Sequence, residues 1–358
     1  MEKYIRSKKK LRIFHLLPSH DLGGAEIASK TCEFIDNKNF TYKTFYISEN
    51  KINKNDFLQI IKQIKNYLIA LRFFLNQKDF ILISSLWKSS LLSLLIKLFL
   101  PKTKVILFLH STKSSHFFDK AFTSFLLIFA YEVWADSKNT LIKRFDELMF
   151  KRKFIKTKIV SFVLRRLKPV NYGENISFNF IYWGRLHKVK NLKKAIKFFN
   201  KFYCLDNSSK LTLIGHDYGM KNEIRKIIRN LKLTNNVKIL KFMDMKDITE
   251  IVKDYSFFLQ LSSYEGMAMA VVESMQLGLI PIVTNVGEIE NYCIDLKNSI
   301  IYEGMQDTFE KVLKVKNNYK NCKEISNRAI STWNNKNLYH EDIFFLCQSL
   351  YDEREIYL

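Results

Sequence analysis

Two glutamates in one short segment are the first candidates for chemistry in this sequence. Glu265 and Glu273 are separated by seven residues, and small residues lie between them. Strand-like runs of apolar residues lie on both sides of the segment. Where a strand leads into a helix, the free backbone N–H groups at the helix start can hold a diphosphate. The N–H groups expected to do so here are those of Gly266, Met267, Ala268 and Met269.

The two carboxylates can hold what lies on either side of the phosphates. Glu273 falls about two turns into the expected helix, where a carboxylate can accept hydrogen bonds from both ribose hydroxyls. The spacing alone also fits two solvent-facing glutamates on an amphipathic helix. The flanking sequences Ser-Ser-Tyr-Glu-Gly and Gly-x-x-Pro-Ile-Val favour a ligand site, and the segment points to an enzyme that uses a nucleotide sugar.

A second candidate site begins at Trp183-Gly184-Arg185-Leu186 and continues to Lys190. The segment follows a strand-like run and opens a helix, which places Arg185 and Lys190 to meet a diphosphate from the opposite side. Two fixed cations would offset the charge that builds on a leaving nucleoside diphosphate. Taken alone, two cations in a lysine-rich protein are more simply explained as surface residues.

The first half of the chain contains two weaker candidates. Gly23 and Gly24, within Asp21-Leu22-Gly23-Gly24-Ala25-Glu26, separate a strand from a helix and allow a ligand to approach the backbone closely. A Gly-Gly pair is more commonly a turn than a site. His110 ends the strand expected over 104–110, and a lone histidine is usually structural.

These segments resemble the donor-binding signatures of retaining glycosyltransferases of family 4, which have the GT-B fold. The family pattern is Glu-Gly-x6-Glu-Ala-Met-x2-Gly, a Pro-Val strand, a Gly-rich turn and a further Glu, preceded by Gly-Arg-Leu-x3-Lys. The chain departs from it at Ser274 and Glu288 and lacks the family's Asn-Gly-Val-Asp turn, having residues 158–164 in its place. The matching positions of the first pattern are Glu265, Gly266, Glu273, Met275, Gly278, Pro281, Gly287 and Glu290.

The resemblance implies a role for each site residue. Glu265 would contact the donor sugar, and the anomeric configuration would be retained. His110 would line the sugar site, with its part in acid–base chemistry left open. The residues given a catalytic role are Glu265, His110, Arg185 and Lys190. The donor-binding residues are Gly23, Gly24, Arg185, Lys190, Gly215, Met243, Glu265, Gly266, Met267, Ala268, Met269 and Glu273.

The elements that must position these residues alternate between strand and helix along the whole chain, which predicts parallel sheets covered by helices. We expect an α/β protein of the GT-B type, with two Rossmann-like domains that face each other across a cleft. Apolar periodicity is lost around Pro169, so the domains are placed at 1–170 and 171–340. A C-terminal helix over 341–358 is expected to pack back on the first domain. The helix expected over 54–75 is amphipathic, and the residues on its apolar side are Phe57, Ile60, Ile61, Ile64, Leu68 and Leu71.

The net charge of +23 is unevenly distributed. Residues 1–170 contain 32 Lys and Arg but 13 Asp and Glu, whereas residues 171–358 contain 26 and 22. An anionic partner of the first half is therefore expected, either a nucleic acid or an anionic membrane surface. Mixed cations and aromatic residues at 87–88, 113–120 and 151–168 favour the membrane. A generally lysine-rich genome is the alternative explanation.

The remaining composition excludes several classes of protein. The five cysteines are widely spaced and contain no Cys-x-x-Cys, which suggests a reducing compartment and no zinc module. The sequence has no Asp-x-Asp and no cluster with metal-ligand spacing, so a nucleotide sugar, UDP- or GDP-linked, is expected as co-substrate without a metal. No apolar stretch reaches the ~18–20 residues needed to span a bilayer. We expect a cytoplasmic protein, peripheral at the inner face of the cytoplasmic membrane.

The function expected from these features is transfer of a hexose from a nucleotide-diphosphate donor to a lipid-linked glycan. The product would be O-antigen, capsule or lipopolysaccharide core. A soluble GT-B synthase or a nucleotide-sugar epimerase is the alternative, and it predicts turnover without any lipid acceptor. A nucleic-acid-binding protein is a remote alternative, because the chain has no helix-turn-helix, zinc-finger or RNP-type signature.

Overall fold

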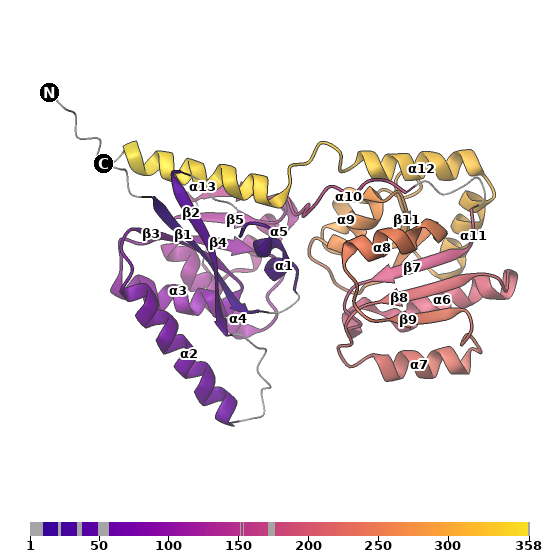
Figure 1. Ribbon diagram of the computed structural model, residues 1–358, viewed down its shortest axis with the longest axis horizontal. Helices are drawn as coiled ribbons and strands as arrows, with labels where there is room; N and C mark the ends of the chain where they lie inside the picture. The colour runs from indigo at the N-terminus through magenta and orange to yellow at the C-terminus, as the bar shows by residue number, and fades with distance from the viewer. Residues whose placement is uncertain are drawn as a thin grey trace. The chain divides into compact units, whose positions relative to one another are not determined.

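The chain forms two compact units, each built on a parallel sheet (Figure 1). The computed structural model describes residues 10–20, 23–33, 38–48, 57–150, 152, 154–170 and 176–356. The first unit comprises 1–164 together with 337–358, and the second comprises 165–336. The structure thus divides the chain after Leu164, and the C-terminal segment rejoins the first unit from Asn337 onward. Asp21, Leu22, Lys151, Lys153 and residues 171–175 lie outside the described residues.

The first unit contains a six-stranded parallel sheet in the order β2-β1-β3-β4-β5-β6. Its strands are β1 (Leu11–Ser19), β2 (Phe40–Ser48), β3 (Phe80–Ser85), β4 (Lys104–Leu109), β5 (Glu132–Ala135) and β6 (Lys156–Ile159). In the register of the sheet, Ile13 lies opposite both Tyr42 and Ile81. Strand β6 was not predicted, because its four residues lie in the basic run and are all exposed. Exposed lysines are a common feature of edge strands, which they protect from pairing with other chains.

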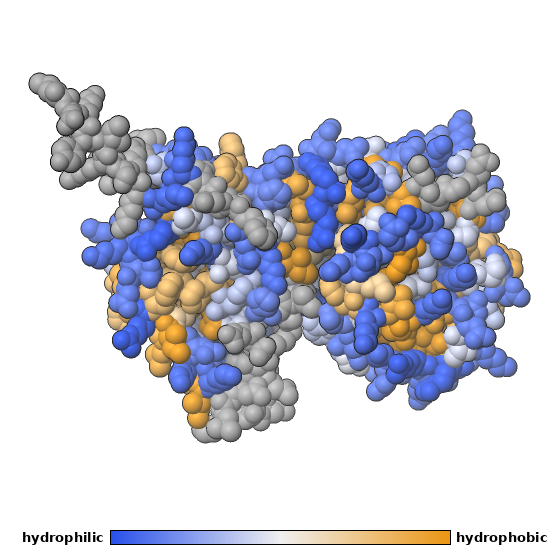
Figure 2. Space-filling model, in the orientation of Figure 1, coloured by the Kyte–Doolittle hydropathy of each residue, from blue (hydrophilic) through white to orange (hydrophobic). Residues whose placement is uncertain are grey.

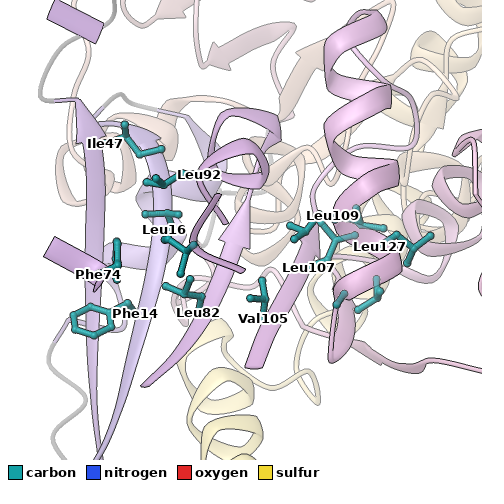
Figure 3. Close-up of a cluster of buried hydrophobic side chains, with 14 of the residues drawn as sticks. Phe14, Leu16, Ile47, Phe74, Leu82, Leu92, Val105, Leu107, Leu109 and Leu127 are labelled. Carbon is teal, nitrogen blue, oxygen red and sulfur yellow. The ribbon is translucent and has the colours of Figure 1, made fainter. Parts of the chain in front are cut away.

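Helices cover both faces of this sheet. They are α1 (Gly24–Lys30), α2 (Phe57–Leu75), α3 (Trp87–Phe99), α4 (Phe117–Phe129), α5 (Lys138–Glu147) and α13 (Tyr339–Ile356). Alternate residues of strands β1 to β5 pack against α2, α3 and α4 in one apolar cluster, as Leu107 and Leu109 do (Figure 3). Phe108 points to the other face and stacks on Tyr339 of α13, with ring centroids 6.3 Å apart.

The C-terminal helix is fixed to the first unit by polar as well as apolar contacts. The backbone N–H of Tyr339 donates to the carbonyl oxygen of Val163 over 2.8 Å, and the side chain of Tyr339 is fully buried. The backbone N–H of Ser161 donates to the Asp342 carboxylate over 2.7 Å. These contacts lie at the start of α13, so the helix is positioned where it returns to the sheet.

The second unit repeats the architecture, with strand order β12-β11-β10-β7-β8-β9. Its strands are β7 (Asn179–Trp183), β8 (Lys210–Ile214), β9 (Val237–Leu240), β10 (Phe257–Gln260), β11 (Ile280–Val283) and β12 (Ile300–Ile301). Its helices are η1 (Lys188–Lys190), α6 (Leu192–Leu205), α7 (Lys221–Asn230), α8 (Met245–Ile251), η2 (Val252–Asp254), α9 (Met269–Gln276), α10 (Ile289–Tyr292), α11 (Met305–Lys316) and α12 (Tyr319–Ser331). Because all strands are parallel, the loops that follow β7, β8 and β10 meet at one edge of the sheet.

The α/β class and the two parallel sheets predicted from the alternating pattern are confirmed. No helix in the described part of the chain is long and apolar enough to cross a membrane.

Candidate active site

The turn after β10 contains the first candidate glutamate. Residues 266–268 form a turn rather than the expected helical start, and α9 begins only at Met269. Ala268 is left-handed, with φ of 54° and ψ of 62°, and such a residue cannot continue a right-handed helix. The prediction that the helix begins at Gly266 is therefore wrong by three residues.

A second loop holds this turn by its carbonyl groups. The N–H of Glu288 donates to the Gly266 carbonyl oxygen over 3.0 Å, and the Tyr292 hydroxyl donates to that of Met267 over 2.8 Å. In a trans peptide the C=O and the next N–H point in opposite directions. The N–H groups of Met267 and Ala268 therefore point away from that loop, as an anion-binding turn requires.

Gly287 makes the contact between the two loops possible. Its φ is +63°, and a Cβ atom there would lie 2.2 Å from the carbonyl oxygen of Glu265. Glycine adopts this left-handed conformation without strain, and because it has no Cβ atom it leaves room for the neighbouring backbone. Glu288, one of the two positions at which the chain departs from the family pattern, donates its backbone N–H to the turn and does not disturb it.

Glu265 is 7% exposed and is held by two donors. Its Oε1 accepts a hydrogen bond from Lys190 Nζ at 2.6 Å and another from Gln260 Nε2 at 2.9 Å. The loop that contains Lys190 is joined to the same turn, because the Ser263 N–H donates to the Val189 carbonyl oxygen over 2.9 Å. Lys190 therefore neutralises Glu265.

Gln260 is a candidate that the sequence did not reveal. It is 1% exposed at the end of β10, and its Oε1 has no partner among the described residues. The hydroxyl of Ser262, two residues on, is likewise buried without a partner in the described part of the chain. A glutamine in the otherwise apolar run Phe257-Phe258-Leu259 was the available signal. A buried amide at the carboxyl end of a central strand indicates that its polar group has a structural or ligand-binding role there.

Glu273 is bound to the neighbouring strand end. Trp183, the last residue of β7, donates its indole N–H to Glu273 Oε2 over 2.9 Å, and the Trp183 ring packs on Phe258. Burial raises the pKa of Glu273 above its ordinary value, although the Trp183 hydrogen bond and the charge of Arg165 oppose that shift. Burial thus disfavours the ionised form of Glu273. Further hydrogen-bond donors to its carboxylate would stabilise that form.

Arg185 is exposed and lies over an aromatic ring. Its guanidinium carbon is 5.6 Å from the centroid of the Tyr218 ring. The two loops that carry Arg185 and Tyr218 meet through glycines, since a Cβ atom at Gly215 would lie 1.8 Å from the Gly184 carbonyl oxygen. Gly215 is thus required by this close contact between backbones. Arg185 keeps its charge accessible, whereas Lys190 is engaged by Glu265.

Met243 lies in the loop after β9 and is partly buried. Its neighbour Phe242 is 45% exposed and stacks on His216, with ring centroids 4.8 Å apart and an interplanar angle of 15°. His216 follows β8, and the sequence did not single it out. An exposed pair of stacked rings at adjacent strand ends offers a flat surface to another ring.

The candidates of the first half belong to the other unit. Gly23 precedes α1 and Gly24 begins it, and the Glu26 carboxylate occupies the space that a side chain at Gly23 would need. His110 follows β4, and its Nε2 lies 2.8 Å from the hydroxyl of Ser85. Its Nδ1 is buried without a partner in the described part of the chain.

His110 is the last member of a buried chain of hydrogen bonds. Ser85 Oγ also lies 2.7 Å from His15 Nε2, and His15 Nδ1 lies 2.5 Å from the Tyr42 hydroxyl. Burial lowers the pKa of both histidines to about 3, so both are neutral near pH 7. The sequence predicted His110 alone, because His15 and Ser85 become its neighbours only through the pairing of β1, β3 and β4.

The described residues contain no group of three or more His, Cys, Asp or Glu side chains that could hold a metal ion.

Comparison with known proteins agrees with this architecture. A structure of HepE from Anabaena, solved in complex with UDP, superposes with a TM-score of 0.75 at 15% identity, covering 95% of this chain and 99% of that one. Sucrose-phosphate synthase from Thermosynechococcus elongatus gives a TM-score of 0.77 at 12% identity, covering 98% and 100%. At these identities the similarity shows the fold alone, which is GT-B.

Sequence comparison defines the family. Residues 147–332, which include Arg185, Lys190, Glu265 and Glu273, match the family Glycosyl transferases group 1, and the chain belongs to this family. A curated relative is the GDP-mannose:cellobiosyl-diphosphopolyprenol alpha-mannosyltransferase of Xanthomonas campestris, 27% identical over 107 residues. That match covers 30% of this chain and 28% of the relative, so it spans less than a third of either protein.

The pair formed by Lys190 and Glu265 should be energetically coupled. Lys190→Met leaves a buried carboxylate without its cation and should lower the free energy of unfolding by about 3 kcal/mol. Adding Glu265→Gln should restore part of that loss, with a coupling of at least about 1 kcal/mol in urea unfolding of both single variants and the double variant. The exposed pair Lys253–Glu250 is the control, with an expected coupling below about 0.5 kcal/mol. Additive losses at positions 190 and 265 would contradict the pairing.

Glu273 should lower stability at neutral pH. Because its pKa is raised in the folded protein, the stability that it contributes is present when it is protonated and is lost as the pH rises through that pKa. Glu273→Gln keeps an acceptor for the Trp183 N–H and should therefore unfold at higher urea concentration than the wild type at pH 7. The difference should shrink at pH 4. The exposed Glu250→Gln is the control, and a destabilised Glu273→Gln at pH 7 would refute the assignment.

Proposed function

We propose that this protein is a retaining hexosyltransferase of family 4 that uses a UDP- or GDP-linked donor. Its acceptor is a lipid-linked glycan, and its product is O-antigen, capsule or lipopolysaccharide core of the bacterial surface. The observation that carries the proposal is the turn after β10, where Glu265 is held by Lys190 and Gln260 while two backbone N–H groups point away from the supporting loop.

In the proposed complex, the diphosphate accepts hydrogen bonds from the N–H groups of Met267 and Ala268 and from the start of α9. Arg185 and Lys190 supply positive charge to the same phosphates. These cations would stabilise the negative charge on the leaving diphosphate, as a divalent metal ion otherwise would, so we expect no metal requirement. Glu273 accepts hydrogen bonds from the ribose hydroxyls, and the rings of Phe242 and His216 lie beside Met243 in the loops proposed to receive the base.

The reaction replaces one bond at the anomeric carbon of the sugar. The bond to the β-phosphate oxygen breaks, and the acceptor hydroxyl oxygen forms the new bond on the same face of the ring. The acceptor proton passes to the leaving diphosphate. Glu265 contacts the sugar through the carboxylate oxygen that Lys190 and Gln260 leave free.

The acceptor class rests on the curated relative. That protein is named for a diphosphopolyprenol-linked acceptor and a GDP-mannose donor, whereas the HepE structure holds UDP. The base of the donor is therefore proposed as either uridine or guanosine. An acceptor of this kind lies in a membrane, so we place the working enzyme at a membrane surface.

A donor-binding screen tests the proposal. One of UDP, GDP or ADP should raise the melting temperature of the purified protein, because a ligand present at 100 times its Kd adds about 2.7 kcal/mol of stability. Arg185→Ala and Glu273→Gln should each weaken that nucleotide by about tenfold or more, since both remove hydrogen bonds that involve a charge. Arg328→Ala, an exposed cation on α12, is the matched control. The proposal would be refuted if none of the three nucleotides stabilised the protein, or if both site variants bound the nucleotide with wild-type affinity.

A further inference from the structure

Helix α2 exposes part of the apolar side that the sequence predicted, although Leu71 of that side packs against the core. Ile61, Ile64, Leu68 and Ile69 are each 49–62% exposed. The core is instead contacted by the opposite side of the helix, where Ala70 and Phe74 are buried. The space-filling view shows apolar patches among polar ones where Figure 1 places α2 (Figure 2).

Cations accompany this apolar row. Lys62, Lys65 and Arg72 are exposed on α2, and the helix has no Asp or Glu. At 3.6 residues per turn, Lys65 and Arg72 fall on the same side as Ile61 and Leu68. The outward face of α2 is thus a row of large aliphatic side chains interleaved with long cationic ones, which is the composition of helices that lie at the surface of a membrane.

The neighbouring helices on this side of the sheet have the same character. Helices α3 and α4 pack with α2 over the apolar cluster of Figure 3. Together the three helices contain six Lys and Arg and a single acidic residue, Asp119, which is paired with Arg144. On α4 a second set of large side chains is exposed, comprising Phe117, Phe118, Phe125, Ile128 and Phe129. A positive field therefore accompanies exposed apolar groups across this whole layer of helices.

Charge complementarity indicates which kind of partner binds this face. A second copy of the chain would bring the same cations together, and a nucleic acid would leave the aliphatic row in water. An anionic lipid surface satisfies both features, since phosphates meet the cations and the acyl boundary takes the aliphatic side chains. Because one side of α2 is packed on the core, the helix can lie along a bilayer but not cross it.

We propose that the outward face of α2, with α4 beside it in the same layer, docks the protein on a bilayer that contains anionic lipids. The 19 residues of α2 span about 28 Å, so its axis lies along the membrane and its aliphatic row enters the headgroup region. This inference specifies the membrane contact of the proposed function and rests on that function for its purpose. It does not require the donor site, which belongs to the second unit.

Vesicle co-sedimentation tests the docking face. The wild type should bind large vesicles of phosphatidylglycerol and phosphatidylcholine and should bind pure phosphatidylcholine far more weakly. Leu68→Glu should weaken binding about tenfold or more, because it removes a leucine side chain that the lipid would bury and adds an anion. Lys65→Gln should weaken it about fivefold, and the loss should shrink at high salt. Phe345→Glu is the matched control, since Phe345 is 74% exposed on α13 at the other face of the same sheet.

Results of two kinds would overturn the inference. The first is equal vesicle binding by Leu68→Glu and Phe345→Glu, or no binding by the wild type. The second is a dimer of the wild type in solution that Leu68→Glu dissociates, which would assign the face to a second copy. Nucleotide binding measured without vesicles distinguishes the docking face from the proposed glycosyltransferase function. Leu68→Glu should bind the nucleotide with wild-type affinity. Vesicle binding without any nucleotide binding would refute the proposed function and leave the docking face standing.

Discussion

The hydrogen-bonded group formed by Glu265, Lys190 and Gln260 is the constraint on which the candidate site depends. A buried carboxylate is expensive unless it is paired and hydrogen-bonded, and here one oxygen atom receives both an ammonium and an amide. Gln260 and Glu265 lie at the end of β10 and in the turn that follows it, whereas Lys190 comes after β7, so the pairing fixes the loop after β7 against the turn after β10. The same arrangement keeps a cation beside the proposed diphosphate site.

The backbone of neighbouring loops holds this hydrogen-bonded group in place. Gly287 allows the loop after β11 to contact the turn, and hydrogen bonds from that loop occupy its carbonyl groups. The N–H groups on the opposite side are then left for a ligand. Gly184 and Gly215 bring the neighbouring strand ends into contact in a similar way. The site is therefore built largely from backbone, with a small number of charged side chains placed at its edges.

Much of the fold could be predicted from sequence, because the alternation of apolar strands and amphipathic helices is a local signal. The donor segments were also visible, since Glu265, Glu273, Arg185 and Lys190 lie in short patterns. The start of α9 was misplaced because the left-handed conformation of Ala268 has no signature in residue type. Other parts of the site have no local signal in the sequence, because their contacts depend on which strands are adjacent. They are Gln260, His216 and the hydrogen-bonded chain from Tyr42 through His15 and Ser85 to His110. The apolar side of α2 was visible in sequence, but burial alone showed that it faces outward.

The most direct test of this account is a crystal structure of the protein with bound UDP or GDP. We predict diphosphate oxygens within hydrogen-bonding distance of the N–H groups of Met267 and Ala268, with Lys190 Nζ moved from Glu265 toward the phosphates and the ribose hydroxyls on Glu273. A diphosphate bound elsewhere, with the contact between Lys190 and Glu265 intact and Glu273 still bonded to Trp183 alone, would contradict it.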